Sequence, residues 1–166
     1  MINAEGLEKI TNGYFIATAL KPASEMKTRD EDYIAAGTVN WVTQVAHKPL
    51  LMALSVEVDS HLNETIDHSG KFTLHLLSED QAELVERFAQ RSEITDETIN
   101  GVEYTRDGDE LILNNTLGQI ECKLENSLRC GSHTLHIGKV VFSELRGYAR
   151  PLHTERLPSS YQGVKA

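Results

Sequence analysis

The chain has 166 residues, of which 40% are apolar and 25% are charged. This length fits one ordinary domain, and the apolar content supports a core without disulfides or a structural metal, which excludes a disordered or collagen-like chain. With 16 Lys and Arg against 25 Asp and Glu, the formal net charge is −9. Because such a surface repels a phosphate backbone, we expect no nucleic acid as a partner.

The apolar pattern predicts a cytoplasmic protein with no membrane partner. The longest aliphatic run, residues 50–54, is far shorter than the ~20 residues that a bilayer-spanning helix needs. Residues 1–5 have neither the basic start nor the apolar stretch of a signal peptide. Two cysteines, Cys122 and Cys130, are too few for the disulfide scaffold of a small secreted protein.

In the first half of the chain, a short helix at residues 5–10 precedes three predicted strands, at residues 14–20, 33–45 and 50–56. The strand at 50–56 is apolar on both faces, as expected at the centre of a barrel or beneath a helix. A helix then begins at Ser60, a good N-cap, and stops at Gly70, which suits the residue after a helix.

In the second half, a strand at residues 71–77 precedes a third helix, which starts from the capping-box residues Ser78 and Gln81 and runs to about Arg91. Three further strands are predicted at residues 111–113, 117–128 and 133–145. Many strands with few helices between them favour an antiparallel barrel over a βαβ sheet. The predicted fold is therefore a single mainly-β domain over residues 1–166, with peripheral helices.

Several familiar sites are absent from the sequence. There is no glycine loop of the dinucleotide-binding or triphosphate-binding type and no nucleophile-elbow motif. Cys122 and Cys130 are separated by seven residues without a second pair, which excludes a zinc ribbon. His133 and His136 point to opposite faces of a predicted strand. We therefore predict no metal site.

One strand carries short polar side chains on a single face. Thr38, Asn40 and Gln44 alternate with Val39 and Trp41. The polar face either meets water or lines a pocket for a flat heterocycle with donors and acceptors along one edge, such as a flavin or a pyrimidine. Gly37 would allow a close approach of the ligand to the backbone.

Two further stretches have both a structural and a functional interpretation. Ser60 and Thr65 lie where a helix start favours an anion, although a capped surface helix is the commoner explanation of such residues. His133 follows a glycine turn at Gly131. It is either a structural or exposed histidine, or it guides a hydride donor or a proton beside a cofactor.

In this order and spacing, the stretches resemble the flavin reductase-like FMN-binding split-barrel family. The similarity covers residues 7–152, leaving residues 153–166 as a C-terminal tail. It rests on GTVNWVTQ (37–44) followed by Lys48-Pro49-Leu50, on Ser60 to Thr65, on SGKFTLHLL (69–77) followed by Asp80-Gln81, on IECK (120–123), and on GSHTLHIGKV (131–140). The Asn-Trp-Val-Thr-Gln version is similar to flavoredoxin-like members and to flavin reductase modules of diflavin electron-transfer proteins.

The resemblance implies an antiparallel split barrel of Greek-key type that forms a homodimer with one FMN per subunit near the interface. It places the flavin ring and ribityl chain at Thr38, Val39, Asn40, Trp41, Val42 and Thr43, and the phosphate at Ser60 and Thr65. It puts His133, the catalytic candidate, near the nicotinamide or the acceptor. Three positions depart from the family pattern: His75 replaces the usual Asn, Ser132 replaces the Asp before His133, and Pro151-Leu152 lacks a following Tyr, with only Tyr161 beyond it.

The predicted function is that of an FMN-dependent oxidoreductase of the flavin reductase type. It would take electrons from NAD(P)H and pass them through FMN to a small-molecule or protein acceptor, namely free flavin, a ferric chelate or a redox partner. One alternative is a non-enzymatic flavoprotein that stores flavin or relays electrons between proteins. Another is that the barrel holds haem or a different ligand.

Overall fold

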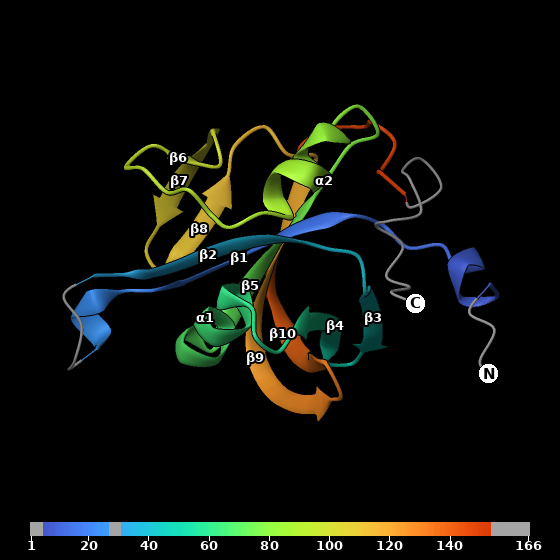
Figure 1. The fold of residues 1–166 in the computed structure, drawn as a ribbon, viewed down its shortest axis with the longest axis horizontal. Helices are drawn as coiled ribbons and strands as arrows, with labels where there is room; N and C mark the ends of the chain where they lie inside the picture. Colours follow the sequence, from blue (N-terminus) through green and yellow to red (C-terminus); the bar gives the residue numbers. More distant parts are fainter. Residues whose placement is uncertain (1–4, 27–30, 154–166) are drawn as a thin grey trace.

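The computed structural model describes residues 5–26 and 31–153 (Figure 1). Seven strands form one antiparallel sheet in the order β2-β1-β5-β9-β10-β4-β3. They are β1 (Phe15–Lys21), β2 (Tyr33–Val39), β3 (Val42–His47), β4 (Leu50–Glu57), β5 (Lys71–Leu76), β9 (Gly118–Cys130) and β10 (His133–Leu145). A second sheet contains β6 (Thr98–Ile99), β7 (Val102–Asp107) and β8 (Glu110–Leu113). The mainly-β class is confirmed.

The predicted strand at residues 33–45 is two strands, and they lie at opposite edges of the sheet. Val39 is the last residue paired with β1, whereas Val42 pairs with Leu54 on β4. Asn40 and Trp41 carry the chain from one edge to the other, so a single alternating pattern spans two ladders. No ladder joins β2 to β3 among the described strands, and no closed barrel forms there.

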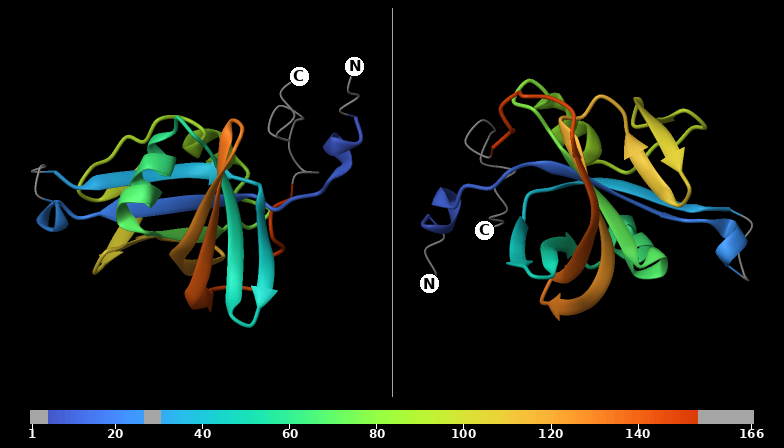
Figure 2. Two further views of the ribbon diagram at one scale, coloured as in Figure 1. Left: turned by 90° about the horizontal axis from the view of Figure 1, so that it is seen from below. Right: turned by 180° about the vertical axis from the view of Figure 1, so that it is seen from behind.

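Two helices cover opposite sides of the β1–β2 pair (Figures 1 and 2). Helix α1 (His61–Ser69) packs on a core that includes Ala17 and Ala19, whereas α2 (Glu83–Phe88) packs on one that includes Ile16 and Leu20. Because successive strand residues face opposite sides, β1 is buried on both faces. Small alanines face α1, and this leaves room for its close approach.

The helix predictions are confirmed to different degrees. Ser60 caps α1 by accepting the Asn63 N–H at 3.1 Å, and Gly70 ends it with a φ of 68°. Helix α2 starts later than predicted, because Gln81 Oε1 accepts the Ser78 N–H at 3.1 Å within a turn before the helix. The N-terminal helix is only the 3-10 turn η1 (Leu7–Lys9), and η2 (Ala23–Glu25) is a second one.

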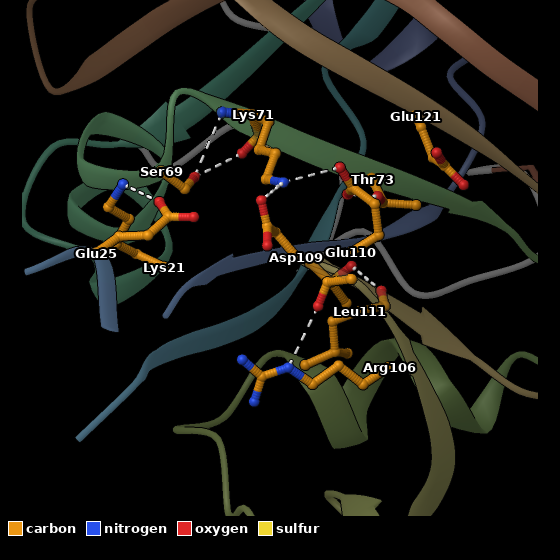
Figure 3. A network of polar contacts seen from close by, with 12 residues as sticks. Lys21, Glu25, Ser69, Lys71, Thr73, Arg106, Asp109, Glu110, Leu111 and Glu121 are labelled. Atoms are coloured by element: carbon orange, nitrogen blue, oxygen red, sulfur yellow. Dashed lines mark hydrogen bonds and ion pairs between the residues drawn. The ribbon is translucent and has the colours of Figure 1, made fainter. Parts of the chain in front are cut away.

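A polar network attaches the small sheet to β5 (Figure 3). Lys71 Nζ lies 3.0 Å from Asp109 Oδ2 and 3.3 Å from Glu110 Oε1, and Thr73 Oγ1 donates to Glu110 Oε2 at 3.0 Å. Burial opposes the charge of Lys71, but the two carboxylates outweigh burial and raise the pKa of the ammonium above its usual value. The network therefore fixes the turn between β7 and β8 against β5. Strands β6 and β7 were not predicted from the sequence.

The end of the described chain returns to the sheet. Leu152 is buried, donates its N–H to Leu77 O at 2.9 Å and accepts the Tyr14 N–H at 3.0 Å. Apart from His153, the predicted tail (153–166) lies outside the described residues, and so does Tyr161. None of the described helices has the length and apolar character needed to span a membrane.

Candidate active site

A cleft of about 980 Å³ opens beside the start of α1. Its walls come from the end of β2, the end of β4, the first turn of α1, the segment after α2 and the turn between β9 and β10. Four of the six predicted flavin-contacting residues line it: Thr38, Val39, Asn40 and Trp41. The predicted strand region and the predicted histidine region therefore meet in one cavity.

The other two residues of that segment lie outside the cleft. Val42 is partly buried against the core cluster beneath α1, and Thr43 is exposed, with Oγ1 donating to Gln44 O at 3.3 Å. Both belong to β3, which continues along β4 at the far edge. The contact of Val42 and Thr43 with the flavin is implied by the family resemblance and stays a prediction.

Thr38 and Ser92 tie the segment around α2 to the outer edge of β2. Thr38 Oγ1 donates to Val85 O at 2.7 Å, so this hydroxyl proton is not available to a ligand. Ser92 Oγ donates to Ala36 O at 3.0 Å and accepts the Ala36 N–H at 3.3 Å. These bonds satisfy edge-strand groups of β2 and place residues 88–92 along one wall of the cleft.

Ser60 and Thr65, both predicted at a phosphate, have different surroundings. Ser60 lines the cleft and is partly exposed; its Oγ donates to Glu57 O at 2.8 Å as well as capping α1. Thr65 is fully buried, and its Oγ1 donates to His61 O at 2.8 Å within the helix. A hydroxyl in that position does not reach the cleft, so the geometry gives Thr65 a role in the helix.

His133 lines the cleft at the start of β10 and contacts Trp41 across it. The ring centroids lie 4.9 Å apart and the ring planes are tilted by 51°. Ser132 Oγ lies 2.9 Å from His133 Nδ1. The serine that replaces the family's usual Asp therefore still forms a hydrogen bond with the ring.

The second departure from the family pattern, His75, lies outside the cleft. Its ring is fully buried on β5, with Nε2 3.0 Å from Thr18 Oγ1. Thr18 donates its own proton to Leu111 O at 2.7 Å, so His75 Nε2 must be the donor. Burial, with the nearby charge of Arg146, lowers the pKa of His75 to about 3. His75 therefore belongs to the core beneath β8.

Arg91 is a cleft residue that sequence reasoning placed only at a helix end. It is exposed, and it is the one Lys or Arg among the described residues lining the cleft. The sequence contained a usable signal, because the polar run Gln90-Arg91-Ser92 follows shortly after the apolar stripe that ends at Phe88. What it could not give was the pairing of Ser92 with Ala36, which brings this run to the cleft.

Known proteins resemble the chain over most of its length. The family model described as "Flavin reductase like domain" matches residues 7–156. A ferric-chelate reductase (NAD(P)H) of Archaeoglobus fulgidus is 29% identical over 147 residues, which cover 87% of this chain and 82% of that protein. A Nostoc protein named diflavin flavoprotein A 2 is 28% identical over 80% of this chain, which spans only 22% of that longer protein.

A solved structure agrees with the sequence comparisons. Flavin reductase PheA2 in its native state superposes with a TM-score of 0.70 at 26% identity, over 89% of this chain and 88% of that one. The NADH:FAD oxidoreductase SgcE6 of Streptomyces globisporus superposes with a TM-score of 0.74 at 14% identity, over 92% and 90% of the two chains, and so supports the fold alone. The resemblance predicted from the motifs is confirmed: the chain belongs to the family of flavin reductase like domains.

Proposed function

We propose that this chain, an oxidoreductase of the flavin reductase type, binds FMN in the cleft and passes electrons from NAD(P)H to an acceptor. The acceptor would be free flavin, a ferric chelate or a redox partner protein. The observation that carries the proposal is that residues 37–41, Ser60 and His133 line one cavity. The relatives support it, since one is named a ferric-chelate reductase (NAD(P)H) and another, from Rhodococcus, an NADH-dependent flavin reductase.

The cleft suits a flavin by size and by its donor set. Its volume of about 980 Å³ lies at the upper end of the range, about 300–1,000 Å³, of sites that bury a small organic ligand. Gly37 leaves one wall without a side chain, and a Cβ there would lie 3.3 Å from Leu62 Cδ2. The Asn40 amide and the backbone groups around it offer donors and acceptors to the edge of a heterocycle.

Ser60 and Arg91 both line the cleft, and we assign the phosphate to them. The first turn of α1 presents N–H groups and the positive end of the helix dipole beside Ser60, and Arg91 adds a cation. The carboxylate of Glu64 lies 3.8 Å from His68 Nε2, one turn further along the helix, so it is directed away from this end. A single phosphate suits this arrangement, which favours FMN over FAD.

Trp41 and His133 form the wall that we assign to the nicotinamide or acceptor side. A bound flavin supplies the electron transfer itself. The hydrogen bond between Ser132 Oγ and Nδ1 fixes the orientation of the His133 ring, and Nε2 is the nitrogen left to meet a ligand. We assign His133 the role of orienting the donor by a hydrogen bond, and Trp41 the role of holding the imidazole against the cleft.

We further propose a split-barrel homodimer, because the described residues leave large apolar side chains in water. Val141, Leu145 and Leu50 are 59%, 64% and 42% exposed, on neighbouring strands of the sheet. Turn η1 stands away from the sheet (Figure 1), and Leu7, its first residue, is 55% exposed. Apolar surface of this kind is typical of an interface, and a stable homodimer interface buries about 2,000 Å² or more in total.

The absorbance spectrum of the purified protein tests the proposal directly. We expect a flavin spectrum, extraction of FMN, and bleaching by NADH or NADPH in anaerobic stopped flow. A bound flavin that neither donor reduces would favour the electron-relay alternative. A haem spectrum, or no affinity for any flavin, would contradict the proposal, and FAD as the tightly bound flavin would contradict its FMN part.

A further inference from the structure

Behind the cleft, a buried imidazole connects β10 to α1. His136 is fully buried, with Nε2 2.8 Å from Asn63 Oδ1 and Nδ1 2.8 Å from Ser127 Oγ. The Asn63 amide nitrogen donates to Val58 O at 3.1 Å, which fixes the orientation of the amide. Asn63 Oδ1 is therefore an acceptor, and Nε2 of His136 must carry the proton that it receives.

The same residues complete a ring of hydrogen bonds around one side of the cleft. Val58 accepts from Asn63 at its carbonyl, and its N–H donates to Ser132 O at 3.0 Å. Ser132 precedes His133, which lies on the same strand as His136. The path that leaves β10 at His136, three residues after His133, thus runs through Asn63 and Val58 to Ser132, the residue directly before His133.

This ring links the two turns that carry Ser60 and His133, both of which line the cleft. Ser60 lies between Val58 and Asn63, and its Oγ accepts the Asn63 backbone N–H at 3.1 Å. The turn that carries Ser60 is therefore held by its own cap and by the Asn63 side chain. The opposite turn, which carries Ser132 and His133, is held through Val58.

We propose that the His136–Asn63 hydrogen bond is a positioning pair that couples the Ser60 turn to the Ser132–His133 turn and so sets the geometry of the cleft. Its effect on ligand binding rests on the proposed function, but its effect on the apoprotein does not. If the bond is lost, the buried Asn63 oxygen has no partner and its amide is no longer held. Both turns then loosen together.

Three variants separate positioning from general stability. His136→Leu removes the donor and keeps a side chain of comparable size. His136→Gln retains an amide N–H that reaches toward Asn63. Ser127→Ala removes only the outer partner, and because Ser127 is exposed, water can replace it.

Hydrogen exchange of the apoprotein gives the first readout. In His136→Leu we expect the amides of Val58 and Asn63 to exchange at least tenfold faster, while those of β7 and β8 keep their wild-type rates. His136→Gln and Ser127→Ala should stay close to wild type. Unchanged exchange at Val58 and Asn63, or an equal acceleration across the whole chain, would overturn the proposal.

Flavin affinity gives the second readout. The dissociation constant for FMN should rise at least tenfold in His136→Leu, and that for riboflavin, which lacks the phosphate, by less than threefold. In His136→Gln, the ratio of the FMN and riboflavin dissociation constants should return to its wild-type value. An equal loss for both flavins would overturn the coupling to the Ser60 turn. A wild-type protein that binds neither flavin would refute the proposed function, and the exchange data would still decide the role of His136.

Discussion

Trp41 and His133 contact each other because the same strand positions both. The Trp41 carbonyl accepts the N–H of Ser55 at 3.0 Å, and His133 pairs with Glu57, two residues further along β4. Alternate residues of a strand face the same side. The end of β4 therefore places two rings on one wall of the cleft: Trp41, from the segment that joins β2 to β3, and His133, from the start of β10. Their centroids are 4.9 Å apart.

We expect His133→Ala to lower the rate of flavin reduction by NAD(P)H by roughly ten- to a hundredfold, the low end of what a positioned acid–base or orienting group contributes. The affinity for FMN should change little, because the residues assigned to flavin binding lie at the end of β2, at the start of α1 and after α2. Anaerobic stopped flow measures the rate per bound flavin, and fluorescence titration measures the affinity.

Ser132→Ala is the matched control for that variant. It removes the hydrogen bond to His133 Nδ1 and leaves the imidazole in place, so the rate should fall by less than in His133→Ala. If His133→Ala instead lowers the melting temperature with no change in the reduction rate, His133 serves only to support the turn after Gly131.

Substitutions of Arg91 and Thr65 should have different effects on the binding of the FMN phosphate. Arg91→Met should weaken FMN about three- to fivefold, as expected for the loss of one exposed cation worth up to about 1 kcal/mol, and leave riboflavin affinity unchanged. Thr65→Val should leave the ratio of the two affinities unchanged, because the Thr65 hydroxyl bonds to His61 O within the helix. Parallel titrations of both variants with both flavins check this. A selective loss of FMN affinity in Thr65→Val would show that the hydroxyl does reach the ligand.

The sequence predicted most strands, because alternation and capping are local properties, and the family resemblance pointed to several residues of the cleft wall, among them Thr38, Ser60 and His133. Ser60 as an N-cap and Gly70 after α1 follow from residue type alone. The crossing at Asn40 and Trp41 could not be predicted in this way, since alternation continues through it although the strand changes partner.

Contacts between residues far apart in the chain could not be predicted from the sequence either. Arg91 reaches the cleft through the bonds between Ser92 and Ala36, which are 56 residues apart. Asn63 and His136, 73 residues apart, each have an ordinary local interpretation, as a polar helix residue and a strand histidine. Only the fold joins them. Strand β7 was missed because its sequence is polar and mostly exposed, with little apolar alternation.

Buried His75 should make the protein less stable in mild acid. In the unfolded chain a histidine takes up a proton below about pH 6.5, whereas burial keeps folded His75 neutral to about pH 3. Between these values the unfolded state binds more protons, so the free energy of unfolding falls as the pH falls, by at most about 1.4 kcal/mol per unit. His75→Asn removes this contribution.

Urea unfolding of both proteins between about pH 4.5 and 7.5 measures that slope. Burial also lowers the pKa of His136, so it adds to the pH dependence in both proteins, and the difference between them isolates His75. We expect the stability of the wild type relative to His75→Asn to fall steadily as the pH drops below about 6.5. Parallel stability curves would contradict the assignment of a neutral, buried His75.

The exposed apolar side chains of β10 and β4 predict how the dimer can be broken. Leu145→Lys or Leu50→Lys would place a charge within the proposed interface, where it would lose its hydration without gaining a partner. Each variant should raise the dimer dissociation constant at least a hundredfold, so that light scattering at micromolar concentration detects monomers. Leu128→Lys is the matched control: Leu128 is 60% exposed, near the other end of the β9–β10 hairpin, and the substitution adds the same charge. A wild-type protein that is already monomeric, or equal dissociation of all three variants, would show that this surface does not pair two copies of the chain.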